Sequence, residues 1–382
     1  RIHSNSFGCG GFKCEFDCVC YIEDEEGNDV VIPNSNCTEA YGTDCCKICN
    51  DYTIDSARAD RFLYEHNDMI VLFSAGNNGE YTYNGTVGSP GLAKNVLTVG
   101  ASKTTNSNFL VSSNYQDPAM FGVSSQLACC LERIFPCCPA LAELEYSDTN
   151  VYNHSNLASF SSRGPTSDQR NKPDLVAPGQ WVVSMHSDGR LNSNQCGTQR
   201  PDGANNAALI SMQGTSMSCP VTAGAAAIVR QYYRDTGRYS DPSGPLIKAT
   251  LINSATPLPG TVSIDGSRTL TIDLPKETPN LYEGYGLVSL SNVLQFEDSE
   301  FQLYTYDMIN ITEGESHTYL FTSNSTTGTS QLKVTLAWYD LPSSVVSKGF
   351  LVNDLDLTVG YFNGTDVTAL GNGIEDHLNN VE

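Results

Sequence analysis

Ser216 stands in the segment of this sequence best suited to nucleophilic chemistry. The segment reads Gly-Thr-Ser-Met-Ser-Cys-Pro at 214–220 and continues into small and apolar residues as far as Val229. This pattern predicts a helix that begins beside Ser216 and, being apolar on all sides, is buried in the core. The Ser216 amide would then be one of the unpaired donors at the helix N-terminus, where it could stabilise an oxyanion. The plainer alternative is that this serine only caps a core helix.

Asn77 is the second residue whose position suits this chemistry. It ends the run Val-Leu-Phe-Ser-Ala-Gly-Asn at 71–77, which predicts a buried strand followed by a turn. Acyl transfer requires a nucleophile, a base that activates it, and donors aimed at the developing oxyanion. Ser216 can supply the nucleophile and one donor, and the Asn77 carboxamide can supply a neutral second donor. An asparagine in a glycine-containing loop can also be a turn residue that tolerates positive φ.

These two segments belong to a series whose order resembles the subtilisin-like serine peptidases. Three further segments that match the family lie at 86–101, 160–165 and 172–179. The resemblance implies that Ser216 is the nucleophile and that the Asn77 side chain donates the second oxyanion hydrogen bond. It implies a serine endopeptidase that hydrolyses peptide bonds of protein or peptide substrates through an acyl-enzyme.

The family's triad aspartate and histidine have no counterpart before Ser216, although subtilases place them in the order Asp, His, Ser. The Asp-Thr-Gly sequence at 235–237 follows the predicted nucleophile helix, and we expect it to be the turn that ends this helix. None of the six histidines is followed by glycine. We therefore expect the triad Asp and His to lie outside these residues, which would be inactive by themselves.

The resemblance also predicts where an extended substrate would bind. Residues 1–8 resemble the family strand that lines the cleft, and residues 74–76 directly precede Asn77. The expected substrate-binding residues are Ser6, Phe7, Gly8, Ser74, Ala75 and Gly76. Both segments could offer backbone groups with which a peptide pairs as an added strand.

The order of apolar segments predicts an α/β domain over residues 1–295. Helices are expected at 53–66, 216–233 and 245–255, and strands at 69–74, 95–100 and 181–185. Strands alternating with helices imply a mostly parallel sheet covered by helices on both faces, as in the subtilisin-like fold. The domain would be incomplete, because the resemblance begins part-way through it.

Residues 296–382 are predicted to form a separate β domain. The acidic run at 297–300 suits a boundary, and 331–340 then alternates apolar and polar residues as a strand does. This arrangement is similar to the subtilases that carry a jelly-roll-like β-sandwich after the catalytic domain. Val221, which follows Pro220, agrees with that branch, and the sandwich would here lack its last strands.

Fourteen cysteines are the clearest departure from the bacterial members of the family. Most lie near 9–50 and 102–150, where the resemblance is interrupted, and we interpret these two segments as cysteine-rich insertions. Disulfides are favoured there, with zinc bound by pairs such as Cys46 and Cys49 as the alternative. Cys219 is instead expected to be a small buried packing residue.

Six N-glycosylation sequons accompany the cysteines. They begin at Asn36, Asn84, Asn153, Asn310, Asn324 and Asn363. Together with the cysteine content, they favour a glycoprotein that is secreted or lies in the lumen of the secretory or endolysosomal pathway.

The formal net charge of −22 argues against nucleic acid and anionic membranes as partners. The sequence has no apolar run of about 18 residues that would cross a membrane. The expected chemistry requires no cofactor. Asp354 and Asp356, with Asn353 and Asp340, could form a structural calcium site, or the alternating acids could be the solvent face of a strand.

Two classes of function remain open. The first is the serine endopeptidase, and the second is a non-catalytic pseudopeptidase or extracellular binding protein that uses the cysteine-rich insertion and the sandwich. The presence of both Ser216 and Asn77 favours the peptidase, because a binding protein has no chemical need for both. Covalent labelling of Ser216 by a fluorophosphonate would discriminate between the two classes.

Overall fold

The computed structural model describes residues 1–6, 20–23, 29–32, 50–80, 85–104, 153–185, 209–264, 270–322, 331–344, 349–362 and 366–382. Most of both cysteine-rich segments, including all but one of their cysteines, lies outside these residues, so the choice between disulfides and zinc stays a prediction. Phe7 and Gly8, expected to bind substrate, also lie outside them.

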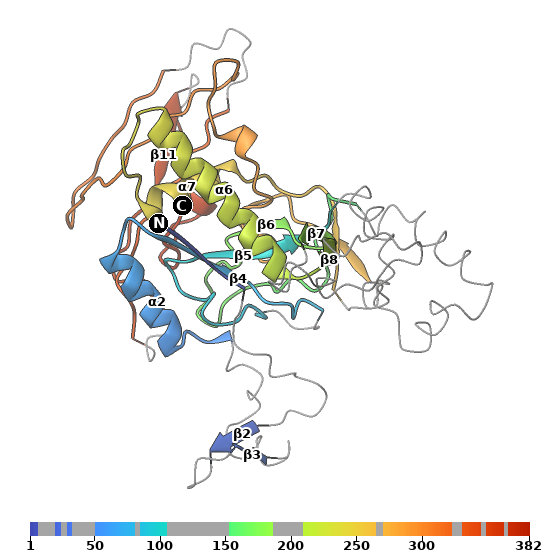
Figure 1. Ribbon diagram of the computed structural model, residues 1–382. Helices are drawn as coiled ribbons and strands as arrows, with labels where there is room; N and C mark the ends of the chain where they lie inside the picture. The colour runs from blue at the N-terminus through green and yellow to red at the C-terminus, as the bar shows by residue number, and fades with distance from the viewer. Residues whose placement is uncertain are drawn as a thin grey trace.

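A parallel sheet forms the centre of the molecule (Figure 1). Its strands are β1 (Ile2–Asn5), β4 (Ile70–Ser74), β5 (Leu97–Ser102) and β6 (Leu175–Pro178), in the spatial order β1-β4-β5-β6. All three neighbouring pairs run parallel, with Leu72 opposite both Ser4 and Leu97. Every residue of β4 and β5 is buried. Their largely apolar runs are typical of a sheet that is covered on both faces.

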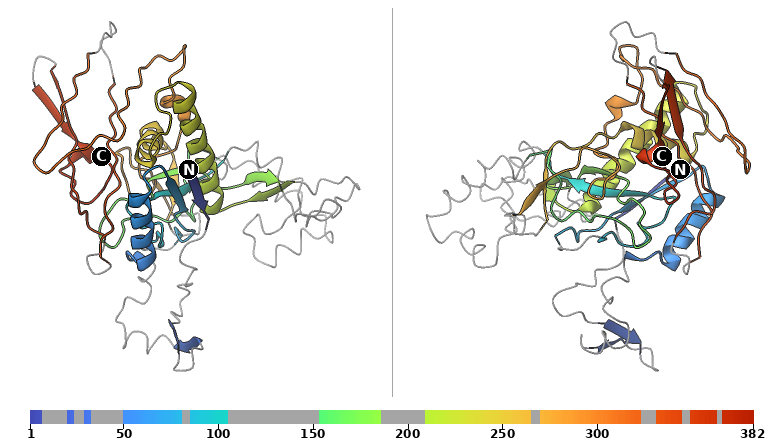
Figure 2. Two further views of the ribbon diagram at one scale, coloured as in Figure 1. Left: turned by 60° about the vertical axis from the view of Figure 1, so that its left-hand side comes forward. Right: turned by 180° about the vertical axis from the view of Figure 1, so that it is seen from behind.

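Helices cover the two faces of this sheet (Figure 2, left). Along β4, Ile70 and Leu72 pack with Val229 of α6 (Thr215–Asp235). The alternate residues Val71 and Phe73 pack on the opposite face with Leu63 of α2 (Ile54–Glu65). Helix α7 (Gly244–Ser254) packs on the same face of the sheet as α6. The predicted parallel sheet with helices on both faces is confirmed.

Local capping signals explain where the helices begin and end. The Thr53 hydroxyl accepts from the amide of Ser56 at the start of α2, and the Ser243 hydroxyl accepts from Leu246 at the start of α7. Helix α6 ends in a turn in which Gly237 adopts φ +68°. The prediction that 235–237 forms the turn ending this helix is confirmed.

Helix α6 differs from the prediction in one respect, because it is not buried on all sides. Val221 is 41% exposed and Ile228 is 53% exposed. The exposed positions of this helix include Pro220, Val221, Gly224, Ala227, Ile228 and Gln231. Their spacing of three to four residues places them on one side, whereas the sheet and α7 cover the other. The alanines and glycines made the sequence apolar all round without requiring burial all round.

The remaining described strands form two-stranded antiparallel sheets. They are β2 (Cys20–Glu23) with β3 (Asp29–Ile32), β7 (Val182–Met185) with β8 (Leu209–Met212), β9 (Thr261–Ser263) with β10 (Thr271–Asp273), and β11 (Thr358–Phe362) with β12 (Asp366–Leu370). Single 3-10 turns lie at η4 (Leu290–Asn292) and η6 (Gly371–Gly373). The β7–β8 pair lies between Gly179 and Gly214 in the chain, and α6 begins directly after Gly214.

Among the described residues of 296–382, the β11–β12 pair forms the regular β-sheet. Residues 331–340, predicted as a strand, contain instead an isolated bridge between Ala337 and Val381. Leu332, at the start of this segment, is 59% exposed, so its alternating pattern is not buried against a second sheet. The β-sandwich therefore stays a prediction. Within the described residues, no helix has the length and hydropathy needed to cross a membrane.

Candidate active site

Ser216 is the second residue of α6 and lies where the end of β1 meets the start of this helix. Its hydroxyl donates to the carbonyl of Ser6 at 3.0 Å, and the Ser6 hydroxyl donates to the carbonyl of Ser216 at 3.0 Å. Ser216 is half-buried, while Ser6 is exposed. The two segments thus hold the candidate nucleophile in the first turn of α6 and beside the residue that follows β1, an edge strand of the described sheet.

The Asn77 side chain reaches the same helix terminus from the turn after β4. Its Oδ1 accepts from the Thr215 amide at 2.9 Å and from the Thr215 hydroxyl at 2.9 Å. The Thr215 hydroxyl in turn accepts from the Gly76 amide at 3.1 Å. Because Oδ1 receives two donors, the orientation of the carboxamide is fixed and its Nδ2 is left as the outward donor.

Gly214 keeps open the space that this donor faces. A Cβ placed on Gly214 would lie 3.3 Å from Asn77 Nδ2 and 3.7 Å from the Ser216 amide nitrogen. The two nitrogens, together with Asn77 Oδ1 at 3.7 Å, therefore lie around one small volume at the start of α6. The backbone of Gly214 has φ +145°, a conformation that disfavours any residue with a side chain. Glycine is thus required here for both space and conformation.

The backbone of Ala75 and Gly76 is already engaged within the protein. The Ala75 amide donates to Val99 and its carbonyl accepts from Gly88, while the Gly76 carbonyl accepts from Ser162. These backbone groups of Ala75 and Gly76 already have partners within the protein, and substrate binding by Ser74, Ala75 and Gly76 stays a prediction. Ala75 packs with the buried side chains of Val87 and Leu92.

Cys219 lies one turn beyond Ser216 and is fully buried in the core cluster that α6 forms with the sheet. Its thiol donates to the Asn5 carbonyl at 3.4 Å and contacts the Ser4 hydroxyl at 3.4 Å. Burial raises the pKa of the Cys219 thiol, so it stays protonated at neutral pH. The expected packing role agrees with this position.

A buried charged group stands behind the sheet, and its partners were not predicted from the sequence. The Asp174 carboxylate accepts from the Thr98 amide at 2.6 Å and from Lys172 Nζ at 2.7 Å, with Lys248 Nζ at 3.7 Å. Burial opposes ionisation of Asp174, but the two ammonium groups outweigh it and lower the pKa of its carboxyl. Burial lowers the pKa of Lys172 to about 8. The group joins β5, β6 and α7, so its role is structural.

Among the described residues, no histidine lies within hydrogen-bond distance of Ser216, and no three His, Cys, Asp or Glu side chains are grouped so that they could hold a metal ion. Asp340, proposed as a calcium ligand, ion-pairs with Lys94 at 2.5 Å, and Asp354 contacts His377 at 2.7 Å. The hydrogen bond that His377 Nδ1 donates to the Asp354 carboxylate raises the pKa of His377. A calcium site at 353–356 stays a prediction.

Thr215 is the residue of this site that reasoning from the sequence did not single out. It precedes the candidate nucleophile directly, and a hydroxyl at that position was the available signal. Its role depends on Asn77, which lies 138 residues away, so it is evident only from the folded chain.

Known proteins that share sequence with this chain identify its family. A sequence model described as the subtilase family matches residues 1–286. The chain is 32% identical over 410 residues to the serine protease/ABC transporter B family protein tagD of Dictyostelium discoideum, covering 87% of this chain but 22% of tagD. It is 26% identical over 210 residues to the serine protease AprX of Bacillus subtilis, covering 50% of this chain and 36% of AprX.

A solved structure of a lanthipeptide protease is 20% identical, covering 62% of this chain and 53% of that one, with a TM-score of 0.35, which is too low to carry an argument. The family match does not depend on it, because the matched residues 1–286 make up more than half of the chain and include the Ser216 site. The chain therefore belongs to the subtilase family.

Proposed function

We propose that this chain carries the nucleophile and the oxyanion-binding donors of a serine endopeptidase. The observation that supports the proposal is that Asn77 Nδ2 and the amide nitrogen of Ser216 lie 3.3 and 3.7 Å from one point, the position of a Cβ on Gly214. Backbone and side-chain donors that converge on a point next to a nucleophile suit stabilisation of a tetrahedral intermediate.

In the proposed reaction, Ser216 Oγ attacks the carbonyl carbon of the scissile peptide bond. A base removes the hydroxyl proton, and the carbonyl oxygen becomes an oxyanion that accepts from Asn77 Nδ2 and the Ser216 amide. The base then gives its proton to the leaving amine, and water releases the acyl group. No histidine of the described residues contacts Ser216, and we propose, from the family order Asp, His, Ser, that the base and its partner acid come from residues outside 1–382.

The substrate in this proposal is a protein or peptide that lies along the end of β1. The Ser6 carbonyl accepts a hydrogen bond from the Ser216 hydroxyl at 3.0 Å. A peptide amide that donated to this carbonyl would therefore lie against the nucleophile. Residues 74–76 would form a side of the pocket. The name of tagD joins a serine protease to an ABC transporter. For this chain we propose the protease activity and a secreted or luminal location, which the sequons and cysteines support.

A fluorophosphonate probe tests this proposal in the full-length protein. Wild-type protein should be labelled at Ser216, the Ser216→Ala variant should lose the label, and a Ser291→Ala control at an exposed serine should retain it. Mass spectrometry of the labelled peptide identifies the site. A folded, fully processed protein that takes no label at Ser216 would contradict a peptidase and favour a pseudopeptidase that functions by binding.

A further inference from the structure

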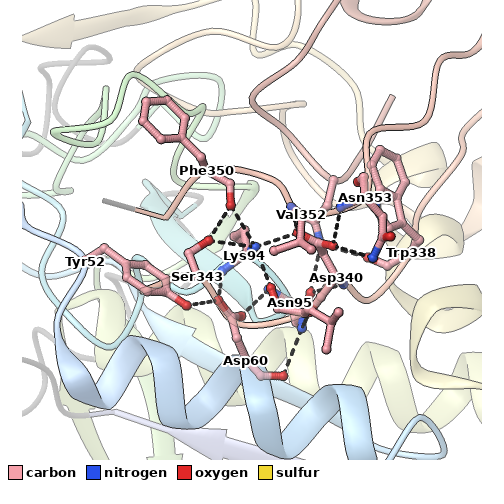
Figure 3. A network of polar contacts seen from close by, with 12 residues as sticks. Tyr52, Asp60, Lys94, Asn95, Trp338, Asp340, Ser343, Phe350, Val352 and Asn353 are labelled. Carbon is pink, nitrogen blue, oxygen red and sulfur yellow. Dashed lines mark hydrogen bonds and ion pairs between the residues drawn. The ribbon is translucent and has the colours of Figure 1, made fainter. Parts of the chain in front are cut away.

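The ammonium group of Lys94 is enclosed by oxygens that come from a distant part of the chain (Figure 3). Its Nζ lies 2.5 Å from Asp340 Oδ2, 2.7 Å from the Leu341 carbonyl, and 3.1 Å from both the Ser343 hydroxyl and the Phe350 carbonyl. The side chains of Lys94 and Asp340 are both 0% exposed. We call these four oxygens from 340–350 the oxygen cage.

The cage is held in shape by contacts that do not involve Lys94. Asp340 Oδ2 also accepts from the Val352 amide at 2.8 Å, and Oδ1 accepts from the Asn353 amide and side chain at 2.9 and 3.0 Å. The Ser343 hydroxyl also donates to the Phe350 carbonyl. The loop is thus folded around the ammonium by its own hydrogen bonds, which favours a cage that persists when the ammonium is exchanged for another.

The donor set of the cage is one that proteins use for free cations. One carboxylate, two backbone carbonyls and a hydroxyl are hard oxygen ligands, and such ligands surround calcium and similar ions. An ammonium group has three N–H donors, so four oxygens exceed its hydrogen-bonding capacity. The fourth oxygen is held by charge, as it would be around a spherical ion.

We propose that the cage is a cation site that the chain fills with its own Lys94, and that an emptied cage binds a free primary ammonium ion. Lys94 belongs to the segment between Asn77 and β5, whereas every cage oxygen comes from 340–350. The tethered cation therefore fastens the C-terminal segment to the α/β domain without a metal ion at this position.

The test uses Lys94→Ala in the full-length protein. This substitution removes a group whose heavy atoms are those of n-propylammonium, so that ion should fit the vacated space. The variant leaves the Asp340 carboxylate buried without its cation, and its unfolding midpoint should fall by about 10 °C. Added n-propylammonium should restore more than half of this loss with saturation, and titration calorimetry should detect its binding to the variant but not to wild type.

Three controls separate the cation from general effects. Neutral n-propanol has the same shape without the charge, and tetramethylammonium has the charge without N–H donors, so neither should restore the midpoint. Lys94→Met keeps the space filled, so this variant should be destabilised and should not respond to n-propylammonium. Calcium and sodium chloride, each tested alone with Lys94→Ala, show whether the emptied cage also accepts a metal ion.

The outcomes decide the proposal in each case. Restoration by n-propylammonium alone supports it, and so does folded Lys94→Ala protein recovered only when that ion is present during refolding. Equal restoration by n-propanol, restoration by a metal ion but not by n-propylammonium, or Lys94→Met as stable as wild type would overturn it. Lys94→Ala protein that stays folded without responding, or that fails to fold with and without the ion, would also overturn it.

Discussion

Thr215 determines the direction of the proposed oxyanion donor. Its hydroxyl accepts a hydrogen bond from the Gly76 amide and donates its own proton to Asn77 Oδ1. Its amide donates to the same oxygen. A carboxamide held by two donors at one end cannot exchange its oxygen and nitrogen without losing both bonds, so Nδ2 faces the space beside Ser216.

Removing this hydroxyl should weaken the donor without removing it. For Thr215→Val we expect kcat to fall about tenfold, because the backbone donor to Asn77 remains and one hydrogen bond contributes about 1 kcal/mol. For Asn77→Leu we expect a larger fall of about 10² to 10³, a magnitude taken over from a family member that lost such a donor. Steady-state kinetics on the full-length enzyme should show both losses in kcat, with KM nearly unchanged. Equal losses in the two variants would contradict the positioning role.

Filling the space at Gly214 should abolish the chemistry. The added methyl group of Gly214→Ala would lie 3.3 Å from Asn77 Nδ2, where the oxyanion is proposed to form, and φ +145° would be strained. We expect fluorophosphonate labelling to fall more than a hundredfold. The matched control is Gly224→Ala within α6, the helix that follows Gly214, where a Cβ meets nothing within 4 Å. The control should label normally and gain about 0.5 to 1 kcal/mol in unfolding free energy. Normal labelling of Gly214→Ala would refute this assignment.

The elements of the sheet are joined by buried charge as well as by apolar contact. Asp174 at the start of β6 accepts from the Thr98 amide of β5, and Lys248 brings α7 to the same carboxylate. Lys172 and Asp174 have side chains that are 3% and 7% exposed. Two ammonium groups and one carboxylate do not balance in charge. Burial also removes the hydration of each ammonium group, which opposes its charged form.

This imbalance predicts a pH dependence of stability. Burial lowers the pKa of Lys172 to about 8, against 10.5 in the unfolded chain. Between these values the unfolded state binds a proton that the folded state lacks, so the unfolding free energy should rise with pH in this window. Below pH 8 the lysine is protonated in both states and its contribution is constant.

The measurement compares wild type with Lys172→Met, which lacks this titration, by chemical denaturation from pH 7 to 10.5. The wild-type curve should rise relative to the variant curve above pH 8. Taking the difference between the two proteins removes the contributions of titrating groups that lie away from Lys172. Parallel curves would show that Lys172 does not titrate in this range.

Across the whole molecule, residues 331–382 are packed onto the α/β domain by specific contacts. Asn95, which is 0% exposed, uses its full hydrogen-bonding capacity there. Its Nδ2 donates to the carbonyls of Asp60 and Asp340, and its Oδ1 accepts from the amide of Asp340 and from Asn380 Nδ2. The Tyr339 hydroxyl adds a bond to the Met69 carbonyl. The two parts therefore share a buried polar boundary.

Replacing Asn95 with leucine should destabilise both parts together. Asn95→Leu removes the Asn95 partners of the Asp340 amide and carbonyl and leaves Asn380 Nδ2 with only its bond to the Trp338 carbonyl, and we expect a loss of at least about 3 kcal/mol. Asn253→Leu is the matched control, because Asn253 also contacts the C-terminal segment, through Lys333 and Thr335, but is half-buried. It should cost less than about 1 kcal/mol. Chemical denaturation followed by circular dichroism measures both, and equal effects would argue against the buried boundary.

The parts of this protein that were correctly predicted depend on short-range patterns. Continuous apolar runs at 69–74 and 95–100 predicted buried strands, and the structure has β4 and β5 there, shifted by one or two residues. Thr53 and Pro245 indicated where two helices begin. The candidate residues Ser216 and Asn77 could be proposed because a helix N-terminus and a strand-ending turn are themselves local features.

The sequence by itself therefore determined which residues have side chains suited to the proposed chemistry and which helices and strands carry them. Tertiary structure alone decided which of them meet, as when Ser6 contacts Ser216 across 210 residues and Lys94 reaches Asp340 across 246. It also decided that one side of α6 is exposed and that the backbone of 74–76 is already bonded. The physical reason is that apolar periodicity and capping act over a few residues, whereas contact, burial and the direction of a hydrogen bond depend on how distant segments pack.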